Sequence, residues 1–214
     1  GAEVEKMSKS KYNVVSPDLI VEKYGADTLR MYEMFLGPLE QFKPWNTNGI
    51  SGVNNFLRKL WRLFHDAEEN FAVTDAEATK EELKTLHKTI KKVTEDIENF
   101  SFNTSVSTFM IAVNELTAQT CISKTILEPL LILISPYAPH IAEELWEQLG
   151  HENSITTAEI PEFDKSHRIE STKADQIAIN GKKRYTIEVT LAISKEEIEA
   201  DEKGNEKRLE KRGE

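Results

Sequence analysis

Apolar residues recur every three or four positions through most of the chain. Residues with this spacing lie on one face of a helix, so the recurrence predicts amphipathic helices. The predicted helices fall within residues 16–25, 27–36, 48–70, 78–100, 103–119, 123–135 and 139–150. In the 48–70 segment the apolar stripe consists of Val53, Phe56, Leu57, Leu60, Phe64 and Ala67. The pattern therefore predicts a helical bundle.

Short polar residues and glycines predict where these helices begin and end. Ser16, Asp27 and Asn103 precede apolar runs. They are expected to cap helix N-termini, because their side-chain oxygens can accept free backbone N–H groups. Gly25 and Gly150 follow apolar runs, and glycine is typical of helix C-termini.

The period of the pattern changes in the last quarter of the chain. Apolar residues alternate with polar or small ones over 177–179 and 185–189. Asn180-Gly181 between the two runs is typical of a type I′ turn, so the segment predicts a β-hairpin. Residues 194–213 have a helical pattern with few apolar positions. A hairpin with one polar helix is only marginally stable, so an incomplete α+β unit is expected.

Composition excludes two classes of protein. No run approaches the roughly 18 consecutive apolar residues of a membrane span, and the N-terminal residues lack the pattern of a signal peptide. The single cysteine, Cys121, cannot form an internal disulfide, so the sequence predicts a soluble, cytosolic (cytoplasmic) protein with no membrane contact. The net charge of -10 argues against bulk attraction to nucleic acid, so any such contact must use local basic patches.

The segment "KMSKS" carries the clearest candidate chemistry. A short polar link separates Lys6 from Lys9, and Ser8 and Ser10 add hydroxyl groups. Such a loop can bring two cations and several donors onto a polyphosphate, where catalysis rests on positioning and electrostatics. The alternative is a solvated basic linker, and a five-residue match alone does not separate the two.

Four segments together resemble a known family. They are "KMSKSKYN", "YGADTLRMYEMF", "WNTNGISGVNNFLRKLWRL" and "PHIAEELWEQLG". In order and spacing they resemble the C-terminal part of bacterial leucyl-tRNA synthetases, which are class I aminoacyl-tRNA synthetases. Isoleucyl, valyl and methionyl enzymes share the KMSKS-type loop and a related "GAD-x-LR" helix. The "MYEMF" run and the "GV-x-x-FL-x-x-xW" helix look closest to the leucyl branch.

This resemblance implies a ligase that uses ATP and Mg²⁺ to join leucine to tRNA(Leu). In the family the KMSKS loop closes on ATP, so Lys6, Met7, Ser8, Lys9 and Ser10 are expected to bind ATP. Lys9 is expected to be the main catalytic phosphate contact, with Lys6 in support. The catalytic and editing domains lie upstream in the family, which predicts a fragment that works with the remainder of the same polypeptide. The fragment alone is expected to be monomeric, to bind no cofactor and to be inactive.

The resemblance also implies the fold class, which is mainly α with a class Ia anticodon-binding-type bundle. Residues 1–45 are expected to hold the KMSKS loop and stem-contact helices at the end of the catalytic domain. Residues 46–165 are expected to form the bundle, and residues 166–214 a partial C-terminal α+β domain with the hairpin. In leucyl enzymes the bundle is expected to support the inner corner and stem of the tRNA and not to read the anticodon.

Three groups of basic residues are candidates for tRNA contact. They are Arg58, Lys59 and Arg62, then Lys88 and Lys91, and then Lys182, Lys183 and Arg184 after the hairpin turn. Each group has an alternative reading as a solvated helix face balanced by acidic residues, or as charges that keep an edge strand soluble. A helical interaction scaffold without catalysis therefore stays open, as does an isoleucyl or valyl enzyme.

Aromatic residues and the cysteine predict packing. Trp61 and Trp146 fall on apolar helix faces and are expected in the core. Trp45, in a loop, can either pack or stack on a base. Cys121 is expected to be a buried small hydrophobe on a helix.

Metal-binding and acid–base chemistry are not predicted. The five histidines are scattered without a cysteine partner, so no metal site is expected. Glu143, Glu144 and Glu147 share one helix without a convergent acid or base and are expected to be solvated.

Overall fold

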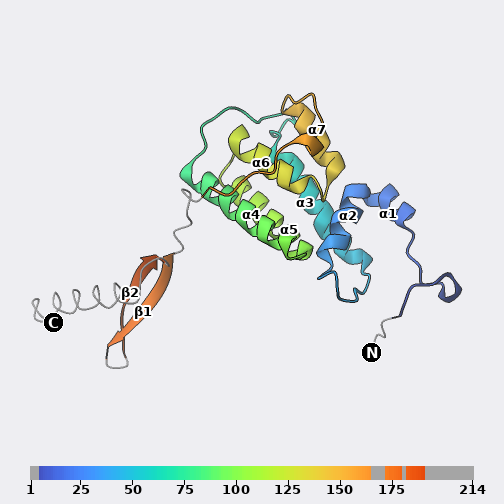
Figure 1. Cartoon of the computed structure of the whole chain (residues 1–214), viewed down its shortest axis with the longest axis horizontal. Coiled ribbons are helices and arrows are strands. Elements are labelled where there is room, and N and C mark those ends of the chain that lie inside the picture. The colour runs from blue at the N-terminus through green and yellow to red at the C-terminus, as the bar shows by residue number, and fades with distance from the viewer. Residues whose placement is uncertain (1–4, 165–171, 180–181, 191–214) are drawn as a thin grey trace, which may run out of the picture. The chain divides into compact units, whose positions relative to one another are not determined.

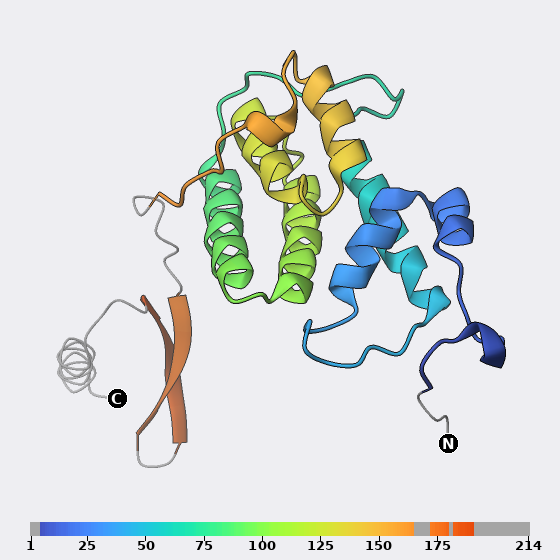
Figure 2. The ribbon, with the colours of Figure 1, turned by 45° about the vertical axis from the view of Figure 1, so that its right-hand side comes forward.

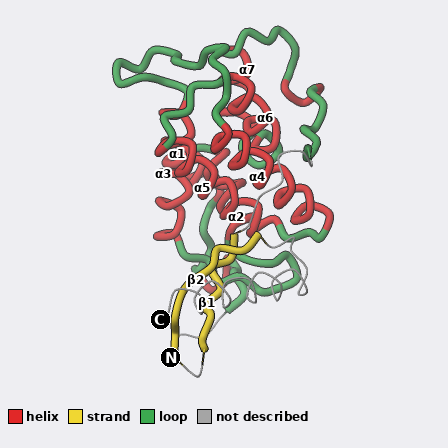
Figure 3. The backbone as a smooth tube through the Cα atoms, turned by 90° about the vertical axis from the view of Figure 1, so that its left-hand side faces the viewer, coloured by secondary structure: helices red, strands yellow, loops and turns green. Residues whose placement is uncertain are grey.

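The computed structural model describes residues 5–164, 172–179 and 182–190 of the chain (Figure 1). It divides into two compact units, residues 1–167 and 168–214, which are considered separately. The predicted mainly α fold is confirmed, because helices make up the first unit (Figure 3). The finer division of the chain by role, at residues 45 and 165, stays a prediction. Within the described ranges, no helix is both long and apolar enough to cross a membrane.

Two short helices begin the first unit, after a 3-10 turn at Lys9–Lys11. They are α1 (Pro17–Tyr24) and α2 (Ala26–Phe35). Gly25 separates them with φ +88°, a conformation that glycine adopts at low cost, and its N–H donates to the Val21 carbonyl at 2.8 Å. Gly25 therefore ends α1 as the sequence predicts. Ser16 occupies the N-cap position of α1, but its side chain makes no capping hydrogen bond.

Asp27 does not cap α2, contrary to the prediction. Gly25 occupies that N-cap position, and Asp27 lies inside the first turn with 8% of its surface exposed. Its carboxylate accepts the backbone N–H groups of His140 at 3.1 Å and Ile141 at 2.7 Å. These residues begin α7 (Pro139–Gln148), so Asp27 caps a helix more than a hundred residues away.

The long third helix is shorter than its apolar pattern suggests. A 3-10 turn at Thr47–Gly49 leads into α3 (Ile50–Leu63), and Ala67 lies exposed in the following loop. The Asp66 carboxylate accepts the backbone N–H groups of Glu68 and Asn70, which turns the chain back on itself. Local side-chain hydrogen bonds of this kind compete with helix continuation, and the periodicity does not register them.

Two antiparallel helices form the middle of the unit, α4 (Lys80–Glu98) and α5 (Phe102–Ala118), joined by a short loop (Figure 2). Thr79 and Glu82 form a reciprocal capping box at the start of α4. The prediction that Asn103 caps α5 is wrong by two residues. Ser101 occupies the N-cap position, because its carbonyl already accepts the N–H groups of Thr104 at 3.1 Å and Ser105 at 3.4 Å.

The apolar α6 (Lys124–Ile134) completes the core with α7 and a 3-10 turn at Ile155–Thr157. Five of its side chains are fully buried, and burial of each contributes about 1.5–3 kcal/mol. They are Ile126, Leu127, Leu130, Leu131 and Ile134.

Cys121 lies in the loop between α5 and α6 and not on a helix, which corrects the prediction. It is buried, as expected, with 2% of its surface exposed. Its N–H donates to the Leu116 carbonyl at 3.0 Å. Burial raises the pKa of the Cys121 thiol to about 12, so the thiol is neutral at physiological pH.

The second unit contains an antiparallel hairpin of β1 (Thr172–Ile179) and β2 (Lys182–Thr190), within the region where residue alternation predicts one. The register shifts between Ile177 and Ala178. The predicted Asn180-Gly181 turn and the polar helix at 194–213 lie outside the described residues.

Candidate nucleic-acid interface

The KMSKS segment forms a small loop that is closed by Asn13. The Asn13 Oδ1 accepts the N–H of Ser8 at 2.8 Å, and its amide donates to the Lys6 carbonyl at 3.4 Å. Ser8 and Ser10 hold their hydroxyl oxygens 3.1 Å apart. Sequence reasoning missed Asn13, although a short amide side chain directly after a turn is a usual way to close it.

Lys6 and Lys9 are the free cations of this loop. Both are exposed, and neither forms an ion pair within the described part of the chain. Lys11 differs, because its Nζ lies 2.6 Å from the Glu5 carboxylate. The loop therefore presents two lysines and two hydroxyl groups to solvent, which suits a polyphosphate ligand.

The helix α3 presents the first basic group on its exposed side. Arg58 and Arg62 are exposed, lie one turn apart and make no ion pair or hydrogen bond among the residues that the structure describes. Lys59 is also exposed, and its Nζ donates to the Asn114 amide oxygen of α5 at 3.0 Å. Two guanidinium groups one turn apart can contact neighbouring phosphates of one strand.

The lysines of α4 are balanced by acidic residues. Lys88 lies 3.8 Å from Glu115, and Lys91 lies 3.9 Å from Glu95. Lys84 and Lys92 have similar partners in Glu81 and Asp96. Exposed pairs of this kind contribute little stability, so they do not hold the lysines in place. The acidic partners nevertheless make the surface around the α4 lysines less positive than the surface around the α3 arginines.

The third basic group lies on β2. Lys182 and Lys183 pair with Ile179 and Ala178, and Arg184 follows in the same strand at the shift of register. The three residues therefore start the second strand, as the hairpin pattern predicts.

The three tryptophans differ in accessibility. Trp146 is buried, and its Nε1 donates to the Asn153 carbonyl at 2.8 Å. Trp45 is half-buried against Tyr32, with ring centroids 5.4 Å apart in an edge contact, so it packs as well as facing solvent. Trp61 is half-buried and stacks on His65, with ring centroids 4.2 Å apart.

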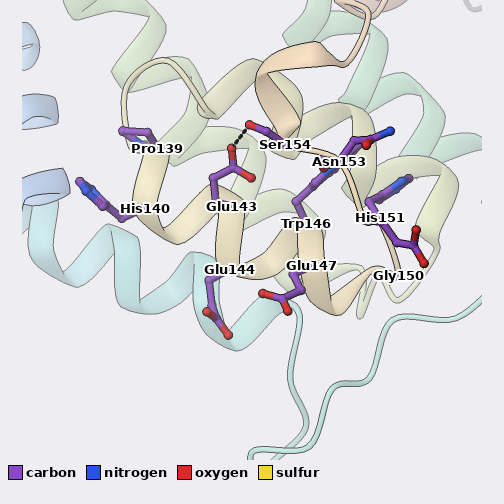
Figure 4. A pocket seen from close by; sticks show the side chains of 11 residues that line it. Pro139, His140, Glu143, Glu144, Trp146, Glu147, Gly150, His151, Asn153 and Ser154 are labelled. Carbon is purple, nitrogen blue, oxygen red and sulfur yellow. Dashed lines mark hydrogen bonds between the residues drawn. The ribbon is translucent and has the colours of Figure 1, made fainter.

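A cleft along α7 has a charge opposite to that of the basic residues of α3 (Figure 4). It has a volume of about 940 Å³, and four of its lining side chains are carboxylates. These are Glu143, Glu144, Glu147 and Glu152. They repel phosphates, so an RNA strand is not expected on this face.

Glu143 corrects a prediction, because it is not simply solvated. It is half-buried and accepts hydrogen bonds from the Ser154 hydroxyl and, at 3.2 Å, from the Ile155 N–H. It thereby holds the 3-10 turn against α7. In the ranges that the structure describes, no group of three or more His, Cys, Asp or Glu residues is arranged to hold a metal ion.

Comparison with known proteins decides the family. Residues 80–200, more than half of the chain, match the model of the anticodon-binding domain of tRNA ligases. The chain belongs to this family. Residues 1–41 also match class I tRNA synthetases of the I, L, M and V group. In this anticodon-binding domain protein, α3 with its two unpaired arginines lies between the matched segments 1–41 and 80–200 and belongs to neither.

Three relatives with high sequence identity are leucine–tRNA ligases. The Christiangramia forsetii protein is 69% identical over 93% of the chain, and the Flavobacterium johnsoniae protein is 65% identical over the same share. The Cytophaga hutchinsonii protein is 63% identical over 96% of it. The chain spans only about a fifth of the length of these relatives, 21–22%. The resemblance to leucyl-tRNA synthetases predicted from the motifs is therefore confirmed.

A solved structure supports the fold. The Agrobacterium radiobacter K84 agnB2 LeuRS, crystallised in a ternary complex with tRNA and LeuAMS, matches with a TM-score of 0.72 at 27% identity. The match covers 92% of this chain and 27% of that one.

Proposed function

We propose that the chain is part of a leucine–tRNA ligase and supplies it with the KMSKS loop and a tRNA-contacting bundle. The observation that carries this proposal is the 69% identity to a leucine–tRNA ligase across nearly the whole chain. An isoleucyl or valyl enzyme remains the alternative within class I, because those enzymes share the loop and the helix that follows it.

The proposed role of the loop is to hold the phosphates of ATP while leucine is activated. Lys9, with Lys6 in support, stabilises the negative charge that develops on the pyrophosphate as it leaves. Met7, Ser8 and Ser10 complete the contact, and Asn13 keeps the loop closed for it. Mg²⁺ arrives with the phosphates of ATP, and no carboxylate of the described loop is assigned to it.

The proposed tRNA surface centres on α3. Arg58, Lys59 and Arg62 are its first contacts, because both arginines are exposed and unpaired within the described residues. Lys88 and Lys91 make a weaker second contact, since each has an acidic neighbour. Lys182, Lys183 and Arg184 form a third.

The proposed setting is the bacterial cytoplasm, with tRNA(Leu) as the substrate. The partner within the same polypeptide is the remainder of the ligase, which the relatives carry over about four fifths of their length. The ligase is proposed to act as a monomer.

Binding of the chain to tRNA(Leu) and tRNA(Ile), measured by fluorescence anisotropy across a salt series, tests this proposal. We expect binding that weakens with salt and favours tRNA(Leu). Replacing Arg62 by Met is expected to reduce the salt slope by about 1, because one phosphate contact is lost. Lys80→Met is the matched control, since it removes the same charge from an exposed position outside the α3 surface.

Three results would count against the proposal. Absence of binding at low salt would favour the helical scaffold, and equal loss from Arg62→Met and Lys80→Met would mean that only net charge matters. Preference for tRNA(Ile) would favour the isoleucyl alternative.

A further inference from the structure

A cleft lies where α3 meets the junction of α1 and α2 and the first turn of α7. It has a volume of about 420 Å³ and is lined from all four helices. The side chains that matter for its chemistry are Asn54, Arg58 and Trp61 of α3 and His140 of α7. Pockets of this size with a few convergent polar groups suit small planar ligands.

The polar groups of α3 in this cleft have unused hydrogen-bonding capacity. The Asn54 amide donates to the Tyr24 carbonyl at 3.3 Å and to the Thr28 hydroxyl at 3.2 Å, which fixes its orientation. Its carbonyl oxygen makes no hydrogen bond within the described ranges, and neither does the exposed guanidinium of Arg58. The cleft thus offers one fixed acceptor beside a cation with five N–H donors.

Trp61 gives the cleft a fixed aromatic wall. His65 stacks on one face of its ring, with an interplanar angle of 17°. The two nitrogens of His65 contact the Trp61 carbonyl at 2.8 Å and the Gln148 amide oxygen at 2.9 Å, so the stack is held from two sides. The half-buried ring also lines the cleft, and a preordered ring loses little entropy when a base stacks on it.

The cleft exposes no free negative charge. Its one lining carboxylate is Asp27, which accepts two backbone N–H groups of α7 and also lies 2.9 Å from the His140 Nδ1. Because the carboxylate can only accept, the His140 Nδ1 donates and the Nε2 is left for a ligand. An anionic ligand is therefore favoured here, in contrast to the α7 cleft with its four carboxylates.

We propose that this cleft takes a single unstacked nucleotide of an RNA strand. The base stacks on Trp61, its edge meets the Asn54 carbonyl oxygen and the His140 Nε2, and its phosphate contacts Arg58. The inference rests on the proposed contact with tRNA and specifies it, since a paired base inside a duplex cannot reach the ring. Arg62, one turn further along α3, does not line the cleft and contacts only the backbone.

Two RNA probes test the cleft: a short fully paired duplex, and the same duplex with one bulged nucleotide. We expect the chain to bind the bulged RNA about fivefold or more tightly, as stacking of one base on an aromatic side chain allows. Arg58→Met and Trp61→Leu are expected to remove most of this preference. Arg62→Met is expected to weaken binding to both probes by the same factor.

The outcomes separate this inference from the proposed function. Equal affinity for the two probes, or the same effect of Arg58→Met and Arg62→Met on their ratio, would overturn the nucleotide site while tRNA binding persists. If the unmodified chain bound no tRNA at all, both the nucleotide site and the proposed function would be overturned. Arg58 is exposed, so its variant reports on the site even if Trp61→Leu, checked by circular dichroism, perturbs the fold.

Discussion

Asp27 and Arg30 join α2 to the start of α7. The Asp27 carboxylate accepts two backbone N–H groups of α7, and the Arg30 guanidinium donates to the Pro136 carbonyl at 3.0 Å. Such groups at a helix N-terminus have no partner within their own helix, so a carboxylate there both satisfies them and favours the helix dipole. The segment that follows the KMSKS loop is therefore fixed to the bundle by side chains and not only by the chain itself.

Replacing Asp27 by Ala is expected to lower the free energy of unfolding by about 2 kcal/mol, measured by urea denaturation. The loss arises because two helix N–H groups at the start of α7 lose their acceptor. Glu33→Ala is the control on the same helix, since Glu33 is exposed and is expected to change stability by less than about 0.5 kcal/mol. Equal effects of the two variants would contradict the capping role.

At the scale of the element, the α4–α5 hairpin shows how local and packing effects combine. The capping box of Thr79 and Glu82 fixes where α4 begins, with bonds of 3.2 Å and 2.7 Å. Leu86, Ile90 and Val93 then face the core from successive turns. Capping sets the register of the helix, and burial of the apolar stripe supplies most of its stability.

Thr79→Ala is expected to cost about 1 kcal/mol of stability at neutral pH. Burial raises the pKa of Glu82, but hydrogen bonds from Thr79 and Cys121 outweigh this and lower the pKa overall. A lowered carboxyl pKa stabilises the fold above the unfolded pKa, and this contribution is lost as the pH falls through the folded pKa. The Thr79 backbone N–H donates to the Glu82 carboxylate, so Glu82→Gln is the variant that removes this charge. The difference in stability between wild type and Glu82→Gln, measured by urea denaturation, should therefore be smaller at about pH 3 than at neutral pH. A difference that does not change with pH would remove Glu82 from the explanation.

At the scale of the whole molecule, a negative total charge coexists with local basic surfaces. The chain carries a net charge of -10, yet both α3 arginines are unpaired in the described structure and four carboxylates gather along the α7 cleft. Charge is thus divided between two neighbouring sites of the first unit, which share His140. The negative surface opposes non-specific binding of RNA, and the α3 surface keeps a short-range attraction.

The chain alone is expected to give no leucine-dependent pyrophosphate exchange, because it spans only 21% of the Christiangramia forsetii ligase. In that full-length protein, replacing the lysine that matches Lys9 by Met is expected to slow exchange at least tenfold, since one charge on the leaving pyrophosphate loses its partner. The lysine that matches Lys11 is the control, because Lys11 pairs with Glu5. Exchange by the chain alone would contradict its expected inactivity, and equal effects of the two lysines would exclude the proposed role of the loop.

The helical segments, most of their apolar faces, the glycine at the end of α1 and the KMSKS loop could be predicted from the amino-acid sequence. These features depend on residues a few positions apart, whose geometry the helix period fixes. The basic group on α3 also followed from spacing alone. The family resemblance followed from four short motifs in order, which the comparisons confirm.

The contacts of Asp27, Cys121 and Glu143 became evident only from the folded chain. Asp27 meets its partners across 113 and 114 residues of chain, and no local pattern encodes such a contact. The α3 cleft is likewise made by four helices that meet only in the folded unit. Local spacing could thus place Arg58 and Trp61 on one helix, but the cleft that both residues line forms only when α3 packs against distant segments of the chain.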